Sequence, residues 1–96
     1  MWLQFGSNHM PTTREIIYRE TVSASGPVKA YNTALYRNWV IAHVGLQDQE
    51  LWLRDRDLDM VMENVRCKHL HAYRLVTTFY VELTAEQHVE YVMTWG

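Results

Sequence analysis

The chain has 96 residues, of which 48% are hydrophobic and 21% are charged, and its formal net charge is −2. This length fits one domain and excludes two separate cores, and the apolar content excludes wholesale disorder. The slight negative charge argues against broad electrostatic capture of nucleic acid, and no apolar run approaches the roughly 18 residues of a membrane-spanning helix. We therefore expect neither a membrane nor a nucleic-acid partner.

A single cysteine, Cys67, excludes an internal disulfide framework and any metal site built from several cysteines. The sequence does not open on a basic region followed by a long apolar segment, so a secretory signal is not supported. These features predict a cytoplasmic protein.

The first 13 residues differ from the rest, because residues 6–11 are rich in turn formers and break any periodicity. A Gly-Ser pair followed by His-Met is typical of cloning-vector sequence, in which case the natural start is Met10. We therefore predict a flexible or vector-derived arm over residues 1–13 and a single domain over residues 14–96.

Arg14–Val22 is rich in β-branched and aromatic residues, which predicts a strand. In regular alternation, Ile16, Tyr18 and Val22 would share one face of that strand. A capped helix over the same residues is the alternative, because the period does not exclude it.

A helix is expected from Pro27 to Val44, with a cap at Ser25 or Gly26 and a stop at Gly45. Its predicted core side holds Val28, Tyr31, Leu35, Trp39 and Ala42. The opposite side carries a second apolar ridge at i, i+4 and i+8, formed by Tyr36, Val40 and Val44. A single core does not require this ridge.

Leu46–Arg54 alternates poorly, and Leu51–Leu53 is expected to form a short strand or an apolar loop. Asp55 or Asp57 can then cap a helix that runs to about Leu70. The residues expected to stack on its buried face are Leu58, Val61, Met62, Val65 and His69.

Tyr73–Leu83 alternates cleanly between apolar and mixed positions and predicts a strand. Thr84 and Gln87 have the spacing of a capping box, which opens a final helix through Trp95. The apolar side of this helix is expected to hold Ala85, His88, Val89, Val92 and Trp95.

These elements predict the α+β class, a single domain with a small sheet of two or three strands covered by about three helices. A sheet this small is marginal alone and has exposed edges. Pairing with a second copy across a two-fold axis is a common remedy, so we expect a homodimer.

Cys67, His69 and His71 are the only cluster of metal-ligand types, and they would share a face if the segment were extended. The expected helix splits them, so we predict no metal or cofactor. Arg66 and His71 could assist phosphate chemistry, but no second base or partnered nucleophile accompanies them. The acidic residues in 55–59 lack the glycine and glutamate of a calcium loop.

The composition instead resembles that of recognition surfaces, with four tryptophans, six tyrosines, two phenylalanines and five methionines. Only two of the nine cationic residues are lysine, and arginine is the cation that interfaces favour. The first hypothesis is a small non-enzymatic protein-interaction module of a regulatory, adaptor or inhibitor type, which docks on a partner protein and on itself. The predicted contact residues are Tyr36, Arg37, Val40 and Val44.

Two alternatives stay open. One is a small metal-binding or hydrolytic protein organised around Cys67, His69 and His71. The other is a nucleic-acid binder that combines tyrosine stacking with arginine contacts from Arg14, Arg19, Arg54, Arg56 and Arg74.

Overall fold

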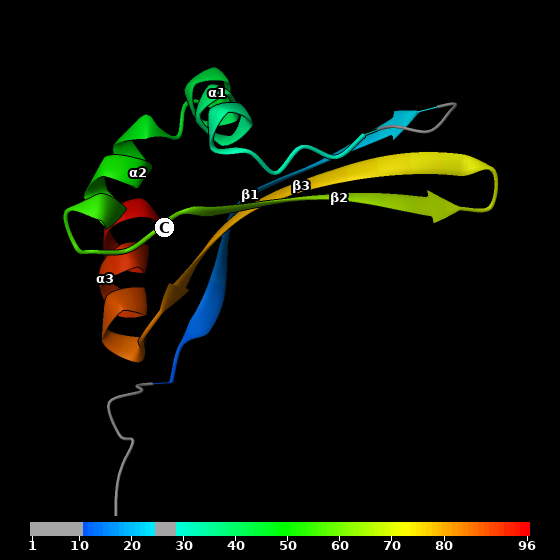
Figure 1. The fold of residues 1–96 in the computed structure, drawn as a ribbon. Helices are drawn as coiled ribbons and strands as arrows, with labels where there is room; N and C mark the ends of the chain where they lie inside the picture. The colour runs from blue at the N-terminus through cyan, green and yellow to red at the C-terminus, as the bar shows by residue number, and fades with distance from the viewer. Residues whose placement is uncertain (1–10, 25–28) are drawn as a thin grey trace, which may run out of the picture.

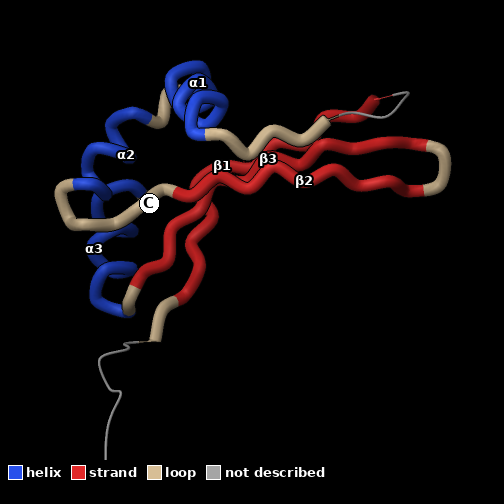
Figure 2. Tube along the Cα trace, in the orientation of Figure 1, coloured by secondary structure: helices blue, strands red, loops and turns tan. Residues whose placement is uncertain are grey.

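The computed structural model of the chain describes residues 11–24 and 29–96, without the side chains of Ala24 and His69. In chain order the elements are β1 (Thr13–Ala24), α1 (Ala34–Val44), α2 (Gln47–Arg54), β2 (Val61–His69), β3 (Ala72–Leu83) and α3 (Ala85–Trp95). The strands form one antiparallel sheet in the order β1-β3-β2, and the helices gather on one side of it (Figures 1 and 2). The predicted α+β class is confirmed. Residues 1–10 of the predicted arm lie outside the described residues.

β1 pairs with β3 along its whole length, so the strand prediction is confirmed and the helical alternative is wrong. Its alternation is interrupted by a β-bulge at Ile17, because Ile16 lies opposite Tyr80 whereas Tyr18 lies opposite Phe79. The extra residue reverses the alternation of the strand. Ile16 therefore faces away from the side that carries Tyr18, and the prediction of one shared face is wrong.

α1 begins at Ala34, seven residues later than predicted, and residues 29–33 are not helical. The expected cap at residues 25–27 lies outside the described residues. Thr33 caps the helix instead, since its hydroxyl accepts a hydrogen bond of 3.1 Å from the backbone N–H of Tyr36. Gly45 ends the helix as predicted, with a φ of 90° that suits glycine.

The buried side of α1 is not the predicted one. Val40 is 5% exposed and belongs to the core, whereas Leu35 is 82% exposed and Trp39 is 58% exposed. The two apolar stripes lie about 100° apart around the helix, so hydrophobicity alone does not choose between them. Contacts made by Arg37 with Met60 and Glu50 fix the rotation of the helix.

The segment between α1 and β3 has the opposite secondary structure from the one predicted. Gln47–Arg54 is a helix. Leu46, just before the helix, and Leu53, within it, are seven positions apart, and both are buried in the core. Val61–His69 is a strand, although its apolar spacing also fits a helix. Pairing with β3 decides the outcome, because a two-residue turn at 70–71 folds the chain back directly into β3.

β3 and α3 form where they are predicted. The capping box is present: the backbone N–H of Gln87 donates to the Thr84 hydroxyl, and the backbone N–H of Thr84 donates to the Gln87 side chain at 2.8 Å. The predicted buried side of α3 is wrong in part, because Val89 and Val92 are exposed and Tyr91 enters the core.

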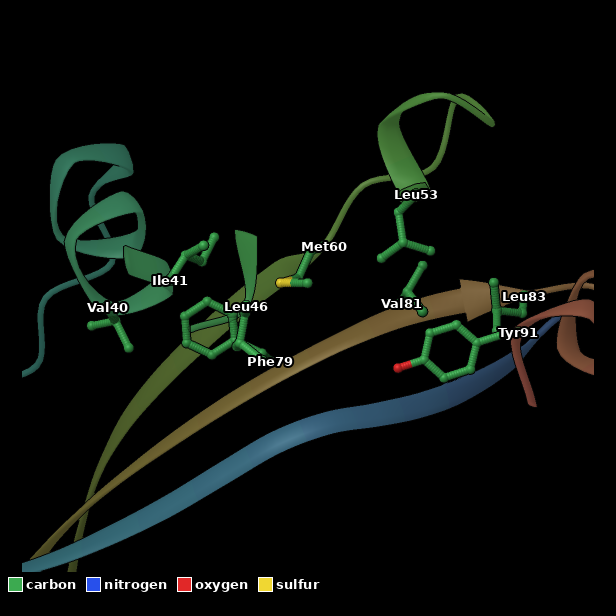
Figure 3. Close-up of a cluster of buried hydrophobic side chains, with 9 residues drawn as sticks. All are labelled: Val40, Ile41, Leu46, Leu53, Met60, Phe79, Val81, Leu83 and Tyr91. Carbon is green, nitrogen blue, oxygen red and sulfur yellow. The ribbon is translucent and has the colours of Figure 1, made fainter. Parts of the chain in front are cut away.

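The core lies between the helices and one face of the sheet (Figure 3). Phe79, Val81 and Leu83 alternate along β3 and form its floor. The helices and connections add the remaining buried side chains, which are Val40, Ile41, Leu46, Leu53, Met60 and Tyr91. No described element covers the other face of the sheet.

Asn64 ties the segment before α1 to the outer edge of β2. Its side-chain amide donates to the Thr77 hydroxyl at 2.5 Å and accepts from the backbone N–H of Tyr31 at 2.9 Å. Its backbone N–H and C=O both pair with the side chain of Asn32, at 2.9 and 3.1 Å. Asn32 therefore takes the place of a neighbouring strand at this edge.

We expect Asn64→Ala to lower the free energy of unfolding by about 1–3 kcal/mol, because Asn64 is 2% exposed and the substitution strands the polar groups that it satisfies. Urea unfolding followed by circular dichroism measures the change. Glu63→Ala, at an exposed neighbouring position, is the control and should change stability by less than about 0.5 kcal/mol. Equal effects of the two substitutions would contradict this role for Asn64.

Ionisation of Tyr91 should also lower the free energy of unfolding at alkaline pH. Burial raises the pKa of the Tyr91 hydroxyl above the usual 10.0, and a hydrogen bond from Gln49 partly offsets the rise. The folded protein disfavours the ionised form of Tyr91, so the neutral hydroxyl contributes to the free energy of unfolding. This contribution is fully present below pH 10.0 and is lost as pH rises through the folded-state pKa. Above pH 10.0, Tyr91→Phe should lose stability less steeply than the wild type in urea unfolding. Tyr31→Phe, at an exposed tyrosine, should follow the wild type.

Candidate interaction surface

The exposed side of α1 carries no formally charged side chain. It holds Ala34, Leu35, Asn38, Trp39, Ala42 and His43. The solvent-facing sides of the other two helices do carry charges, such as Asp48 on α2 and Glu86 on α3. A solvent-facing helix side is normally polar and charged, and depletion of charge together with a tryptophan is typical of the centre of an interface.

Four aromatic rings lie in a row along this part of the molecule. Trp39 stacks on His43 with 4.9 Å between ring centroids and an angle of 8° between planes, and Tyr36 stacks on Trp39 at 6.1 Å. Tyr31 continues the row at 5.9 Å from Tyr36. Trp39 is therefore held in place by its neighbours, which lowers the entropy cost of using it in binding.

A hollow of about 260 Å³ lies beside this row, between α1 and the strands β1 and β3. Its lining consists of Glu20, Tyr36, Trp39, Val40, His43, Val44 and Thr77. The Tyr18 hydroxyl donates a hydrogen bond of 2.6 Å to Glu20, and this bond raises the pKa of Tyr18. The volume is below the 300 Å³ or more of typical small-molecule sites, so the hollow suits one large side chain of a partner.

The four residues predicted to contact a partner lie together on the sheet-facing side of α1. Val40 is in the core, and Tyr36 and Val44 pack against it. Arg37 donates to the Met60 carbonyl at 2.8 and 3.0 Å and pairs with Glu50 at 2.5 Å. Three of these side chains therefore pack α1 on the core, and Arg37 joins α1 to α2 and to the segment before β2.

The exposed stripe of α1 begins one position before the predicted ridge. Leu35, Trp39 and His43 have the same i, i+4, i+8 spacing as the predicted ridge. The spacing was therefore visible in the sequence. The same sequence nevertheless predicts that Leu35 and Trp39 lie in the core, because tryptophan and leucine are usually buried.

A second cleft, of about 550 Å³, lies between α1, α2 and the start of β2. Three of its four charged side chains pair with one another, since Glu50 contacts both Arg37 and Arg54, the latter at 3.4 Å, and Asp59 is the fourth. Arg37 and Glu50 are therefore engaged in joining the elements around the cleft.

Cys67 and His71 lie near the end of the hairpin formed by β2 and β3. Cys67 is exposed on a strand instead of the predicted helix, and His71 lies in the turn. Among the side chains that the structure describes, which do not include His69, no three His, Cys, Asp or Glu residues gather as metal ligands do.

The five arginines of the nucleic-acid alternative are dispersed over the fold. Arg14 stacks on Tyr80 at 3.7 Å, and Arg56 stacks on Trp52 at 3.6 Å while pairing with Glu90. Arg19 lies on β1, Arg54 at the end of α2 and Arg74 on β3. They therefore do not form one continuous basic groove.

Comparison of the chain with protein-family models, curated proteins and solved structures finds no match. In residues 11–24 and 29–96, no helix is both long enough and apolar enough to cross a membrane.

Proposed function

We propose that this chain is a small non-enzymatic protein-interaction module that docks a partner protein on the exposed side of α1. The observation that carries the proposal is Trp39, which stays more than half exposed while stacked between Tyr36 and His43 on an uncharged helix side. Tryptophan is enriched among the residues that dominate binding energy at interfaces. We propose that this docking serves a regulatory, adaptor or inhibitor role.

The shape and chemistry of the site define the partner segment. The segment is apolar, because it covers Leu35 and Trp39, and it inserts one bulky side chain into the hollow. A lysine, arginine or hydroxyl donor beside that side chain would reach Glu20 in the wall of the hollow. The exposed thiol of Cys67 favours a reducing compartment, so the proposal places this interaction in the cytoplasm.

The proposal predicts that Leu35→Asp weakens partner binding by at least about thirtyfold, the effect of losing one dominant interface residue. Met93→Asp is the matched control, because Met93 on α3 is 83% exposed against 82% for Leu35. Partners are enriched from the source cells with the wild type, and the purified partner is then titrated with each variant by calorimetry.

Circular dichroism should show that both variants are folded. A partner that binds Leu35→Asp as tightly as the wild type, or that is lost only with Met93→Asp, would show that α1 is not the docking surface.

A further inference from the structure

The end of the sheet that lies away from α3 carries cations and no acids. β2 and β3 continue past α1 to the turn at 70–71, and β1 accompanies β3 as far as Tyr73 (Figure 1). Residues 21–47 and 64–81 contain neither aspartate nor glutamate. Four exposed cations lie at this end, and because the whole chain carries −2, the rest of it carries −6. The four are Lys29, Arg66, Lys68 and Arg74.

Arg66 and Lys68 lie on the side of β2 that faces the helices. Strand alternation places them on the same face as Asn64, whose side chain donates to the buried Thr77. They are two residues apart, which is about 7 Å along a strand. Lys68 lies opposite Tyr73 on β3, and its ammonium group is 5.5 Å from the centroid of the Tyr73 ring. This part of β2 therefore presents two cations beside a tyrosine.

Lys29 joins these two cations from the segment before α1. Its ammonium group is 5.4 Å from the centroid of the Tyr31 ring. The backbone N–H of Tyr31 donates to the side chain of Asn64, which places Tyr31 beside β2. The Tyr31 ring also lies 5.9 Å from that of Tyr36 on α1, so Lys29 is on the helix side as well. The three cations on this side form a basic cluster of Lys29, Arg66 and Lys68.

No acid balances the lysines of the basic cluster. Among the described side chains, neither Lys29 nor Lys68 has an ion-pair partner. Glu63 on β2 faces the other side of the sheet, and Glu20 on β1 accepts a hydrogen bond from Tyr18. The acids of α2, α3 and the segment after α2 lie toward the other end of the sheet (Figure 1). Salt largely screens exposed charges more than about 10 Å away, so the net charge of −2 does not cancel the local attraction for an anion.

The tyrosines beside the lysines favour one kind of polyanion. Proteins that bind single-stranded nucleic acid combine cations for the phosphates with aromatic rings on which bases stack. Stacking of a base on tyrosine is stronger than an exposed cation–π contact. A base can therefore replace the ammonium group on the ring of Tyr31 or Tyr73, and the released lysine can contact a phosphate. An acidic protein segment would engage the cations alone.

We propose that the basic cluster, together with Tyr31 and Tyr73, binds single-stranded nucleic acid without sequence preference. The three cations contact phosphates, and the two rings stack bases. A duplex fits this site less well, because its paired bases are not free to reach the rings. The site lies outside the stripe of Leu35 and Trp39, so one chain can hold a protein on α1 and a nucleic acid at the end of the sheet.

Fluorescence anisotropy with labelled oligo(dT) and oligo(U) of about 15 nucleotides measures this binding. Three phosphate contacts give a salt slope of about −2, so raising the salt from about 50 to about 200 mM should weaken binding about twentyfold. Lys29→Gln combined with Lys68→Gln should weaken binding at least about tenfold at the lower salt and reduce the slope to about −0.7. Arg14→Gln combined with Arg54→Gln removes the same charge elsewhere and should change binding less than about threefold. Circular dichroism confirms that each variant is folded.

Two further probes separate stacking from charge. An abasic strand of the same length and a poly-glutamate peptide of the same charge should each bind at least about fivefold more weakly than oligo(dT), because neither can stack on tyrosine. Equal binding of either probe would assign the site to polyanions in general, such as an acidic protein segment, and overturn the proposal. Absence of oligonucleotide binding at the lower salt, or equal losses in the two double variants, would overturn it as well. None of these measurements requires a protein partner, so their outcome is independent of docking on α1.

Discussion

The fold depends on β3, the strand that hydrogen-bonds to a neighbour on each side. β1 pairs with β3 on one side, in a register that a bulge interrupts. β2 pairs with β3 on the other side, and a two-residue turn joins these two strands. One face of β3 supplies the floor of the core through Phe79, Val81 and Leu83. The other face carries Val76, Thr78 and Tyr80, of which Thr78 is only 5% exposed. The alternation of this one strand therefore separates the side chains of the core from those of the opposite face.

The rotation of α1 decides which of its side chains are available for binding. The helix has two apolar stripes, and either of them could pack against the sheet. The polar contacts of Arg37 and the Thr33 cap favour packing of the stripe that contains Val40. The other stripe, with Leu35 and Trp39, is then left exposed. Stacking with Tyr36 and His43 orders Trp39 without burying it, which is the state that a binding surface needs.

The α1 surface and the opposite face of the sheet differ in chemistry. The α1 surface is uncharged and aromatic, and it offers a hollow for one side chain. The opposite face of the sheet carries charged side chains on all three strands, with Arg19 on β1, Arg74 and Glu82 on β3 and Glu63 on β2. Of the two, only the α1 surface shows the depletion of charge that is typical of the centre of an interface.

The sequence by itself determined the elements whose signals are local. Clean alternation predicts β3, the spacing of Thr84 and Gln87 predicts the start of α3, and Gly45 predicts the end of α1. Tertiary structure decided the rest, because Val61–His69 fits either a helix or a strand until β3 pairs with it. The same holds for the candidate site: sequence identifies two apolar stripes on α1, but only packing on the sheet determines which of them is buried.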